Sequence, residues 1–493
     1  MILAALVLLA VGAILVLGVG VRAINSRIGV VSVNPVPFRI HYSWVIVGVL
    51  AVVQIFGSSI FFVAGVMVAP LSDENGGFGW NVGIIGAGIA CYYLFSAIYA
   101  PISGNLGDRY GARRMMLAGI VMYGVGMVAL GFVTQIWQFF LFYSMFMSAT
   151  ASITMVPLMA SITGWFRRRL GIGIGILWAV GGIGTAILAP LIADMFDVVG
   201  WRNTFIFLGI AGSGIMLLLW PFIRSKPADI GIEPYGTLYT DPKTAPMSPS
   251  VMKLRLKVFN QHMRGTHAFW DLPLIHGLGC AGHGIVLIFV VPMAVERGID
   301  LTTAAYILSI LSLVSILSRL GAPILAEIHG PKKLMLASLL IQGITVPILF
   351  VANDPWVFYV FAVVFGFGFG GEWTSYLEIN RRYFGDGPMG GAYGWQMTGA
   401  MVGHAVTTAL AGLVLLATGG SYNTVFALSA AFSLTGVVVI TLLDSTDHIL
   451  IPNWEESLPP EARSSQYIPP AAEDASGPEP GTATGPAVAG GED

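Results

Sequence analysis

The sequence predicts an all-α membrane protein in which two bundles of six helices follow one extra N-terminal helix. Hydrophobic residues make up 56% of the 493 residues and charged residues only 10%, whereas soluble proteins carry roughly 25% charged residues. Apolar runs long enough to span a bilayer recur along the chain, and the basic residues between them gather in alternate loops. We therefore expect a lipid bilayer to surround most of the chain.

Thirteen apolar runs approach or exceed the roughly 20 residues that a helix needs to span the hydrocarbon core. The first covers 2–21 and stands apart from the others. Six predicted helices follow, at 43–71, 80–102, 115–133, 137–165, 170–192 and 204–222. Six more come after a polar stretch, at 269–295, 302–325, 334–351, 356–376, 390–417 and 422–443.

The polar stretch and the two ends of the chain complete the predicted domain organisation. We expect an extra helix with its linker at 1–42, a six-helix bundle at 43–222, a central loop at 223–267, a second bundle at 268–443 and a tail at 444–493. The tail is rich in Pro, Gly, Ala and acidic residues, a composition typical of disorder. The first apolar run lacks a basic flank before it, so we interpret it as a retained helix; a signal-like segment or a misplaced start is the alternative.

The basic residues predict the orientation, because Lys and Arg gather in loops that face the cytoplasm. If the loop before residue 43 is cytoplasmic, that loop and every second loop after it hold nearly all of the 24 Lys and Arg residues. Only Arg202 and Arg297 fall in the opposite set of loops, and Arg319 lies within a helix. A wrong helix count would scramble this alternation. We therefore expect a multi-pass protein of the cell membrane whose central loop and tail are cytoplasmic.

The loop between the second and third core helices carries a compact charged motif. It reads Gly104-Asn-Leu-Gly-Asp108-Arg109-Tyr-Gly111-Ala-Arg113-Arg114. Its glycines allow a tight turn, and Asp108 is placed at a helix end to meet arginines or the N-terminus of a neighbouring helix. A weaker copy occurs half a chain later, with Glu327, Gly330, Lys332 and Lys333 at the corresponding positions and Ile328 in place of Arg109. An ordinary basic turn is the alternative, but the recurrence indicates an internal repeat of six helices.

This motif resembles the signature loop of the major facilitator superfamily of transporters. The resemblance implies that Asp108 and its arginines form a latch that breaks and reforms as the two halves rock about a central site, without contacting the substrate. The glycine-rich stretch after 165–169 and the triplet 200–202 resemble the branch of monocarboxylate transporters and oxalate–formate antiporters. This resemblance covers about 43–443 and implies secondary transport of a small organic anion, a mono- or dicarboxylate, driven by a proton or a counter-substrate.

Two ionisable residues lie well inside predicted helices, where a charge costs about 2.5–3.5 kcal/mol or more. Arg319 in the eighth core helix and Glu372 in the tenth lie at a similar depth. Either Arg319 binds an anionic substrate while Glu372 accepts a proton, or the two form a buried salt bridge that only fixes helix packing. The resemblance supports the first, because carboxylate carriers of this branch have an arginine at this point. The sequence also departs from the pattern of monocarboxylate carriers. Ser315 stands where those carriers have an acid, and the lysine of their first core helix has no counterpart here.

Histidines and uncharged polar residues complete the candidates for contact with substrate or proton. His276 and His283 share one face of the seventh core helix, and His404 lies near the middle of the eleventh. In the N-terminal half the candidates are Gln54, Tyr92, Tyr93, Tyr143 and Ser144. For each of these residues, packing between helices is the alternative role. No histidine pair has the i, i+4 spacing of a metal site, so no metal is predicted.

Several other functional classes find no support in the sequence. We expect no enzyme, because no nucleophile–base arrangement or cofactor loop is present, and no cofactor is predicted. A net charge of −2 argues against nucleic acid. A membrane receptor or scaffold that keeps the transporter fold, or an exporter of other small molecules, is the remaining alternative. The expected partners are therefore a small-molecule substrate and lipid, and the expected state is a monomer.

Overall fold

The computed structural model describes residues 40–72, 78–238, 247–385 and 387–463. The predicted first helix at 2–21 and the part of the predicted tail beyond residue 463 lie outside the described residues. Within them, nearly all of the chain is helical, and the only bridge between extended segments joins Phe166 to Tyr235.

The N-terminal bundle contains six membrane-crossing segments in five stretches of helix. They are α2 (Tyr42–Ser72), α3 (Val82–Tyr110), α4 (Ala112–Gly131), the composite of α5 (Ile136–Phe139), the π-helix η1 (Phe140–Met147) and α6 (Ser148–Ile162), and α7 (Leu170–Leu219). The last of these makes two crossings, because Gly200 adopts φ 79° in its middle and turns the chain back. Glycine is suited to this position because it has no Cβ to oppose a positive φ.

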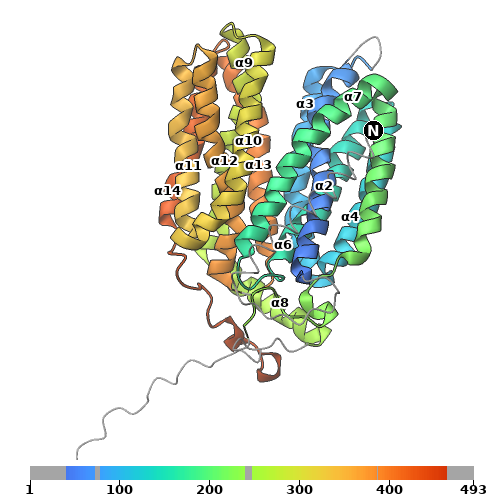
Figure 1. The fold of residues 1–493 in the computed structure, drawn as a ribbon, viewed down its shortest axis with the longest axis vertical. Coiled ribbons are helices and arrows are strands. Elements are labelled where there is room, and N and C mark those ends of the chain that lie inside the picture. The colour runs from blue at the N-terminus through green and yellow to red at the C-terminus, as the bar shows by residue number, and fades with distance from the viewer. Residues whose placement is uncertain (1–39, 73–77, 239–246, 386, 464–493) are drawn as a thin grey trace, which may run out of the picture.

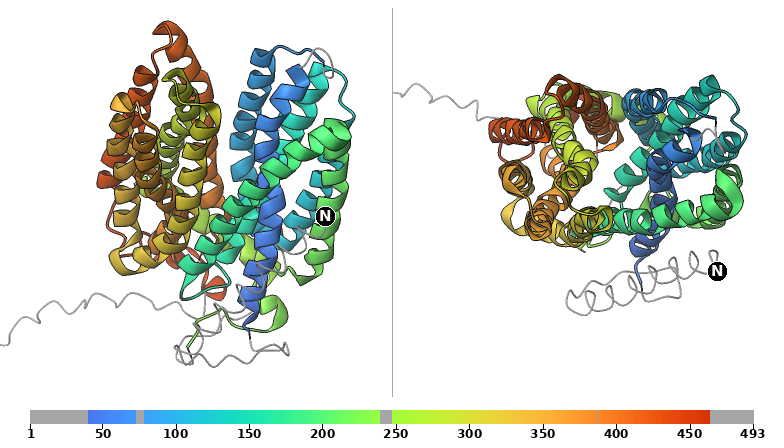
Figure 2. Two further views of the ribbon diagram at one scale, coloured as in Figure 1. Left: turned by 45° about the horizontal axis from the view of Figure 1, so that its top comes forward. Right: turned by 90° about the horizontal axis from the view of Figure 1, so that it is seen from above.

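The C-terminal bundle repeats this plan with six more crossings. They are α9 (His267–Glu296), α10 (Leu301–His329), α11 (Pro331–Thr345) with its 3₁₀ extension η4 (Val346–Val351), α12 (Pro355–Phe384), α13 (Gly390–Ala417) and α14 (Tyr422–Leu442). Figure 2 shows the two bundles side by side, from a tilted direction and from one end. Ten helices of the described residues are long and apolar enough to cross a membrane, and Tyr42–Gly57 and Leu170–Gly184 are shorter apolar helices. Each of the twelve predicted core spans therefore corresponds to a helix, and the predicted fold class is confirmed.

The repeat extends to the turn that the charged motif occupies. Gly111 separates α3 from α4 with φ 84° and ψ 145°, and Gly330 separates α10 from α11 with φ 90° and ψ 139°. Both values are accessible to glycine and unfavourable for residues with a side chain. The two halves therefore use the same backbone turn at the same place.

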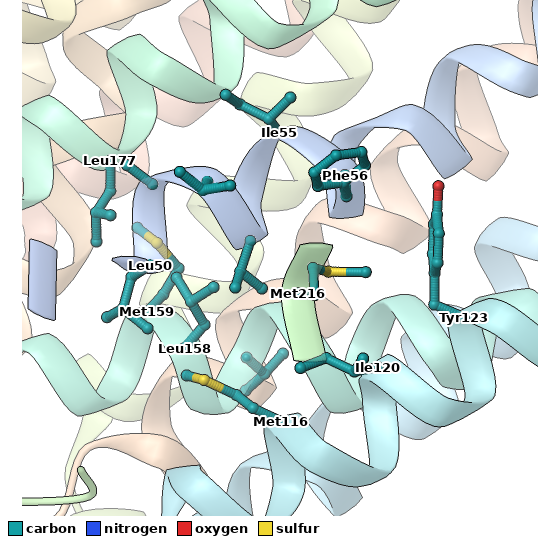
Figure 3. Packing of buried hydrophobic residues seen from close by; sticks show 14 of the residues in the cluster. Leu50, Ile55, Phe56, Met116, Ile120, Tyr123, Leu158, Met159, Leu177 and Met216 are labelled. Carbon is teal, nitrogen blue, oxygen red and sulfur yellow. The ribbon is translucent and has the colours of Figure 1, made fainter. Parts of the chain in front are cut away.

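Each bundle has its own apolar core. In the N-terminal bundle, Leu50 and Phe56 of α2 pack with Met116 and Ile120 of α4 and with Met159 of α6 (Figure 3). The outer faces carry exposed apolar side chains, such as Ile98, Val125 and Leu218, as expected of helices that face lipid.

The central loop and the start of the predicted tail differ from the expectation. The loop contains the amphipathic helix α8 (Pro249–Arg264), and residues 444–463 return to it. Arg255 of α8 pairs with Glu455 at 2.6 Å, and Val258 of α8 is buried with Leu458 and Ala462. The sequence predicts disorder from residue 444 onward, but these few apolar residues find a partner surface on α8, which local composition does not reveal.

The two bundles meet near α8 and diverge toward the opposite end, as Figure 1 shows. α3 lies against α13, and α7 against α10. Small residues allow the close approach. A Cβ on Gly104 would collide with the carbonyl of Gly390, a Cβ on Gly394 would lie 2.6 Å from the carbonyl oxygen of Ala100, and Gly171 packs on Pro323.

Candidate functional site

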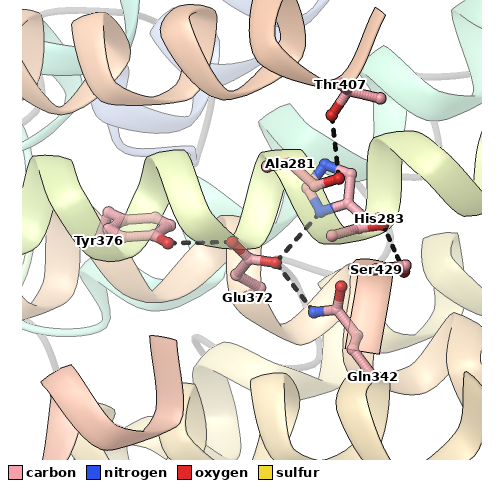
Figure 4. A network of polar contacts seen from close by, with 8 residues as sticks. Ala281, His283, Gln342, Glu372, Tyr376, Thr407 and Ser429 are labelled. Carbon is pink, nitrogen blue, oxygen red and sulfur yellow. Dashed lines mark hydrogen bonds and ion pairs between the residues drawn. The ribbon is translucent and has the colours of Figure 1, made fainter. Parts of the chain in front are cut away.

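A fully buried carboxylate in the C-terminal bundle is held by side chains from three helices. Glu372 of α12 accepts a hydrogen bond from Nε2 of Gln342 on α11 at 2.9 Å and one from the hydroxyl of Tyr376 at 3.0 Å. Nδ1 of His283 on α9 lies 3.4 Å from its second oxygen. Figure 4 shows this network between α9, α11 and α12. The predicted candidates Glu372 and His283 are therefore adjacent, and every oxygen of the carboxylate has a partner, as a buried charge requires.

His276 borders the same network and lies about two helical turns from His283 on the same face of α9. Its ring stacks on Tyr376 at a centroid distance of 3.9 Å, and its Nδ1 lies 3.1 Å from the carbonyl oxygen of Gln396 on α13. Gly279, between the two histidines, leaves room for the Glu372 carboxylate, which a Cβ there would meet. The seven-residue spacing of the histidines thus indicates the correct face of α9.

Aromatic rings connect this network to the N-terminal bundle. His283 and His404 have ring centroids 5.6 Å apart, and His404 stacks on Tyr93 of α3 at 5.4 Å. Tyr92 in turn stacks on Tyr143 at 5.2 Å. The predicted candidates Tyr92, Tyr143 and His404 are therefore parts of one aromatic group that reaches from one bundle to the other.

Trp373 is a residue of the site that the sequence analysis did not identify. It lies beside Glu372 in the chain, and its ring contacts His276 at 5.2 Å and His283 at 5.9 Å. It also meets Trp178 of α7 across the two bundles at 4.8 Å. Tryptophan is common in membrane proteins as an interfacial residue, and only its adjacency to Glu372 could have distinguished this one.

Arg319 of α10 lies at the boundary between the bundles with few partners. Its side chain is 9% exposed, its Nη1 donates to the carbonyl oxygen of Trp178 at 3.2 Å, and its guanidinium lies 5.4 Å from the ring of Phe369. Its Nε makes no hydrogen bond. Among the described residues no acid forms an ion pair with Arg319, so the predicted alternative of a salt bridge with Glu372 is not observed.

Gln54 and Ser144, two further uncharged candidates of the N-terminal half, pack within their own bundle. The side chain of Gln54 lies against Gly181 of α7, within 3.2 Å of where a Cβ would be. Ser144 donates to the carbonyl oxygen of Gly88 at 2.7 Å, which joins η1 to α3. These residues position helices around the boundary rather than meeting a charged group.

Asp108 of the charged motif forms the clearest contact between the two bundles. One oxygen accepts from the backbone N–H of Gly390 at 3.0 Å and the other from Gly391 at 2.8 Å, at the first turn of α13. A carboxylate here interacts favourably with the positive end of the helix dipole. Of the two partners that the sequence analysis considered for Asp108, the structure shows the helix N-terminus.

The arginines and lysines of the two motif copies have other contacts. Arg109 lies over Tyr110, Arg113 lies over Trp220 at 4.5 Å, and Arg114 is exposed. In the second copy Lys332 donates to the carbonyl oxygen of Leu443, and Lys333 is exposed.

A basic cavity of about 400 Å³ lies between the bundles near α8. It is lined by Arg167, Arg168, Arg169, Leu170, Glu327, Glu378, Arg381 and Arg382. Glu378 lies 3.7 Å from Arg382 on the same helix, and Arg381 donates to the carbonyl oxygen of Thr163 in the other bundle at 3.1 Å. Glu327 of the second motif copy therefore faces arginines from both halves.

Comparison with known proteins agrees with this architecture. The family model described as Major Facilitator Superfamily matches residues 47–324 and 274–468. The MFS transporter asaE of Aspergillus flavus is 24% identical over 361 residues, which cover 71% of this chain and 74% of that protein. Monocarboxylate transporter 4 of Rattus norvegicus is 27% identical over 365 residues, covering 71% and 73%, and monocarboxylate transporter 13 of the same species is 23% identical over 400 residues, covering 80% and 85%.

A solved structure shares the fold. The proton:xylose symporter XylE, solved with 6-bromo-6-deoxy-D-glucose, superposes with a TM-score of 0.66 at 14% identity, covering 82% of this chain and 96% of that one. At this identity the likeness supports the fold alone. Two repeated six-helix bundles, the contact of Asp108 between them and a family match over most of the chain lead to one conclusion: this protein is a secondary transporter of the Major Facilitator Superfamily.

Proposed function

We propose that this transporter moves a small organic anion, a mono- or dicarboxylate, across the cell membrane by alternating access, coupled to a proton or to a counter-substrate. The observation that carries the proposal is Arg319. It is a buried cation at the boundary of the two bundles, and the described residues offer it no acidic partner.

An unpaired cation within a membrane-spanning helix is costly, so its presence calls for a ligand that compensates it. The planar guanidinium donates two parallel hydrogen bonds to a carboxylate. Nε of Arg319 is without a hydrogen bond, so it is available as one of the two donors. The similarity to proteins named monocarboxylate transporters supports the same substrate class.

The pair of Glu372 and His283 is the proposed proton site. The two groups are 3.4 Å apart and fully buried, so they interact directly. His404 extends the group toward Tyr93 of the other bundle. A change of protonation at this pair would therefore alter the contact between His404 and Tyr93, where the two bundles meet. Exchange of one anion for another is the alternative form of coupling, and it would not need this pair to titrate.

The contacts between the bundles define the conformation. They run from Asp108 and Gly390 at the α8 end to His404 and Tyr93 near the middle of the helices. The basic loops, which by the distribution of Lys and Arg face the cytoplasm, lie at the closed end. We therefore infer a conformation closed to the cytoplasm, from which the opposite conformation is reached when the Asp108 bonds break.

Uptake into proteoliposomes tests the substrate class. We expect one or more of lactate, pyruvate, oxalate and succinate to be transported, and Arg319→Gln to abolish uptake, because glutamine cannot compensate the anion's charge. Arg319→Lys should restore only part of the activity, since lysine keeps the charge without the planar pair of donors. The exposed Arg264→Gln, in α8 and outside the charged motif, is the matched control and should transport normally. If Arg319→Gln folds and transports as well as the wild type, Arg319 does not bind the substrate; if the wild type transports none of these anions, the organic-anion assignment fails.

A second variant separates proton coupling from exchange. Glu372→Gln keeps the size of the side chain and removes its charge, so we expect pH-driven net uptake to be lost while counterflow of labelled against unlabelled anion continues. Loss of both, with intact folding, would place Glu372 in substrate binding instead. Absence of any flux with carboxylates, sugars and amines alike would favour the receptor or scaffold alternative, and flux of amines or sugars alone would favour the exporter alternative.

A further inference from the structure

A cysteine and two histidines meet in the interior of the C-terminal bundle. Cys280 and His283 lie one helical turn apart on α9, and His404 comes from α13. One ligand atom of each lies within 4.8 Å of those of the other two, and all three side chains are buried. The two helices are locked together at this level, because a Cβ on Gly403 would meet the carbonyl oxygen of Gly277 and because Thr407 donates to the carbonyl oxygen of Ala281 at 2.9 Å.

From this geometry we propose that Cys280, His283 and His404 form a binding site for one soft transition-metal cation, of the class of Zn²⁺ or Cu⁺. Thiolate and imidazole are the ligands these ions prefer. Around a tetrahedral zinc, with bonds of about 2.0–2.3 Å, ligand atoms are about 3.3–3.8 Å apart. The present separations therefore need to close by no more than about 1.5 Å, which side-chain rotation supplies.

Glu372 provides the second, independent observation. Its carboxylate lies 3.4 Å from Nδ1 of His283, the arrangement in which a carboxylate orients a metal-binding imidazole. Both nitrogens of this ring are buried and make no hydrogen bond. Because Nδ1 faces the Glu372 carboxylate, Nε2 is the nitrogen available to a metal. The charges also balance for Zn²⁺, since this divalent cation neutralises the Cys280 thiolate and the Glu372 carboxylate together. Three ligands on a four-coordinate ion leave one position open.

The proposed site stands on the positions of its side chains and does not depend on any transport activity.

The test uses the purified full chain in detergent with Co²⁺ as a spectroscopic probe. We expect one Co²⁺ per chain, a near-ultraviolet charge-transfer band that reports a thiolate ligand, and displacement by equimolar Zn²⁺ but not by Mg²⁺, which prefers oxygen ligands. Cys280→Ser should lose the band, whereas Cys91→Ser, the matched control at the other cysteine, should keep it. His404→Gln and Glu372→Gln should weaken binding at least tenfold, while His276→Gln should not.

Two results would overturn the proposal. One is a wild-type protein that binds Co²⁺ without the thiolate band or does not bind it at all. The other is a band that survives in Cys280→Ser. If the variants do not fold, X-ray absorption of the zinc-loaded wild type decides, because the proposal requires one sulfur and two imidazole nitrogens around the metal. Binding with this ligand set in a protein that moves no carboxylate would support the site and refute the proposed function, so the two failures are distinguishable.

Discussion

Replacing Asp108 by asparagine should release the contact that holds the two bundles together near α8. The carboxylate accepts from two backbone N–H groups of α13, at 3.0 and 2.8 Å. Asparagine keeps one acceptor oxygen, so one charge-assisted hydrogen bond is lost, which is worth about 1.5–3 kcal/mol. The interaction with the helix dipole contributes about 0.3–1 kcal/mol more. The total of about 2–4 kcal/mol corresponds to a shift of roughly 30- to 700-fold toward the conformation open at this end.

Distances between spin labels measure this shift directly. Arg114→Cys and Lys333→Cys place labels on exposed positions of the two bundles near α8, in a background lacking Cys91. We expect Asp108→Asn to broaden the distance distribution and move it to longer values. Asp354→Asn is the matched control, because Asp354 is exposed at the start of α12 and caps nothing. The same distribution in Asp108→Asn, the control and the wild type would refute the latch role of Asp108.

Three further predictions concern other contacts. Gly104→Ala should open the α8 end in the same label assay, because its Cβ would collide with the first residue of α13, whereas Gly321→Ala has open space and should have no effect; equal distances in both would contradict this. Arg255→Ala should speed proteolytic cleavage within 444–463, and a double-mutant cycle with Glu455→Gln should give a coupling of roughly 1 kcal/mol; additive effects would show that the pair does not hold the segment. Burial lowers the pKa of His41 from 6.5 to about 4, so stability present above pH 6.5 is lost as the pH falls toward 4; thermal unfolding at pH 7 and pH 5 should show a smaller loss for His41→Asn, and an equal loss would exclude this origin.

The helices were predictable because each crossing needs one long apolar run. The alternation of basic and non-basic loops supported the number of crossings. The tight turn between the two crossings of α7 was not predictable, because it depends on the backbone angles of one residue, Gly200. α8 was missed for another reason: with its mixed polar and apolar residues, it gives no membrane signal.

The candidate site was only partly predictable from sequence. Depth along a helix follows from residue number, and on that basis the sequence analysis paired Arg319 with Glu372. Rotation about the helix axis does not follow from residue number, because packing decides it. Gly370 of α12 lies against Ser318 and the backbone of Ser315 on α10, and in this arrangement the described structure shows no ion pair between Arg319 and Glu372. The meeting of Cys280 with His404 likewise depends on the packing of α9 against α13, which no local spacing reveals.

The π-helical turn η1 has a consequence for the register of the fourth crossing. A π-helix accommodates one residue more per turn than an α-helix. Deleting one residue from Phe140–Met147 would let the segment relax to α-helical geometry, whereas deleting one from α6 would rotate everything beyond it by about 100°. The stretch Ser148–Ile162 presents Thr154 to Gly119 and Pro157 to Gly107. The π-helical turn thus accommodates one additional residue. As a result, η1 presents Tyr143 to its aromatic neighbours while α6 keeps its contacts with Gly107 and Gly119.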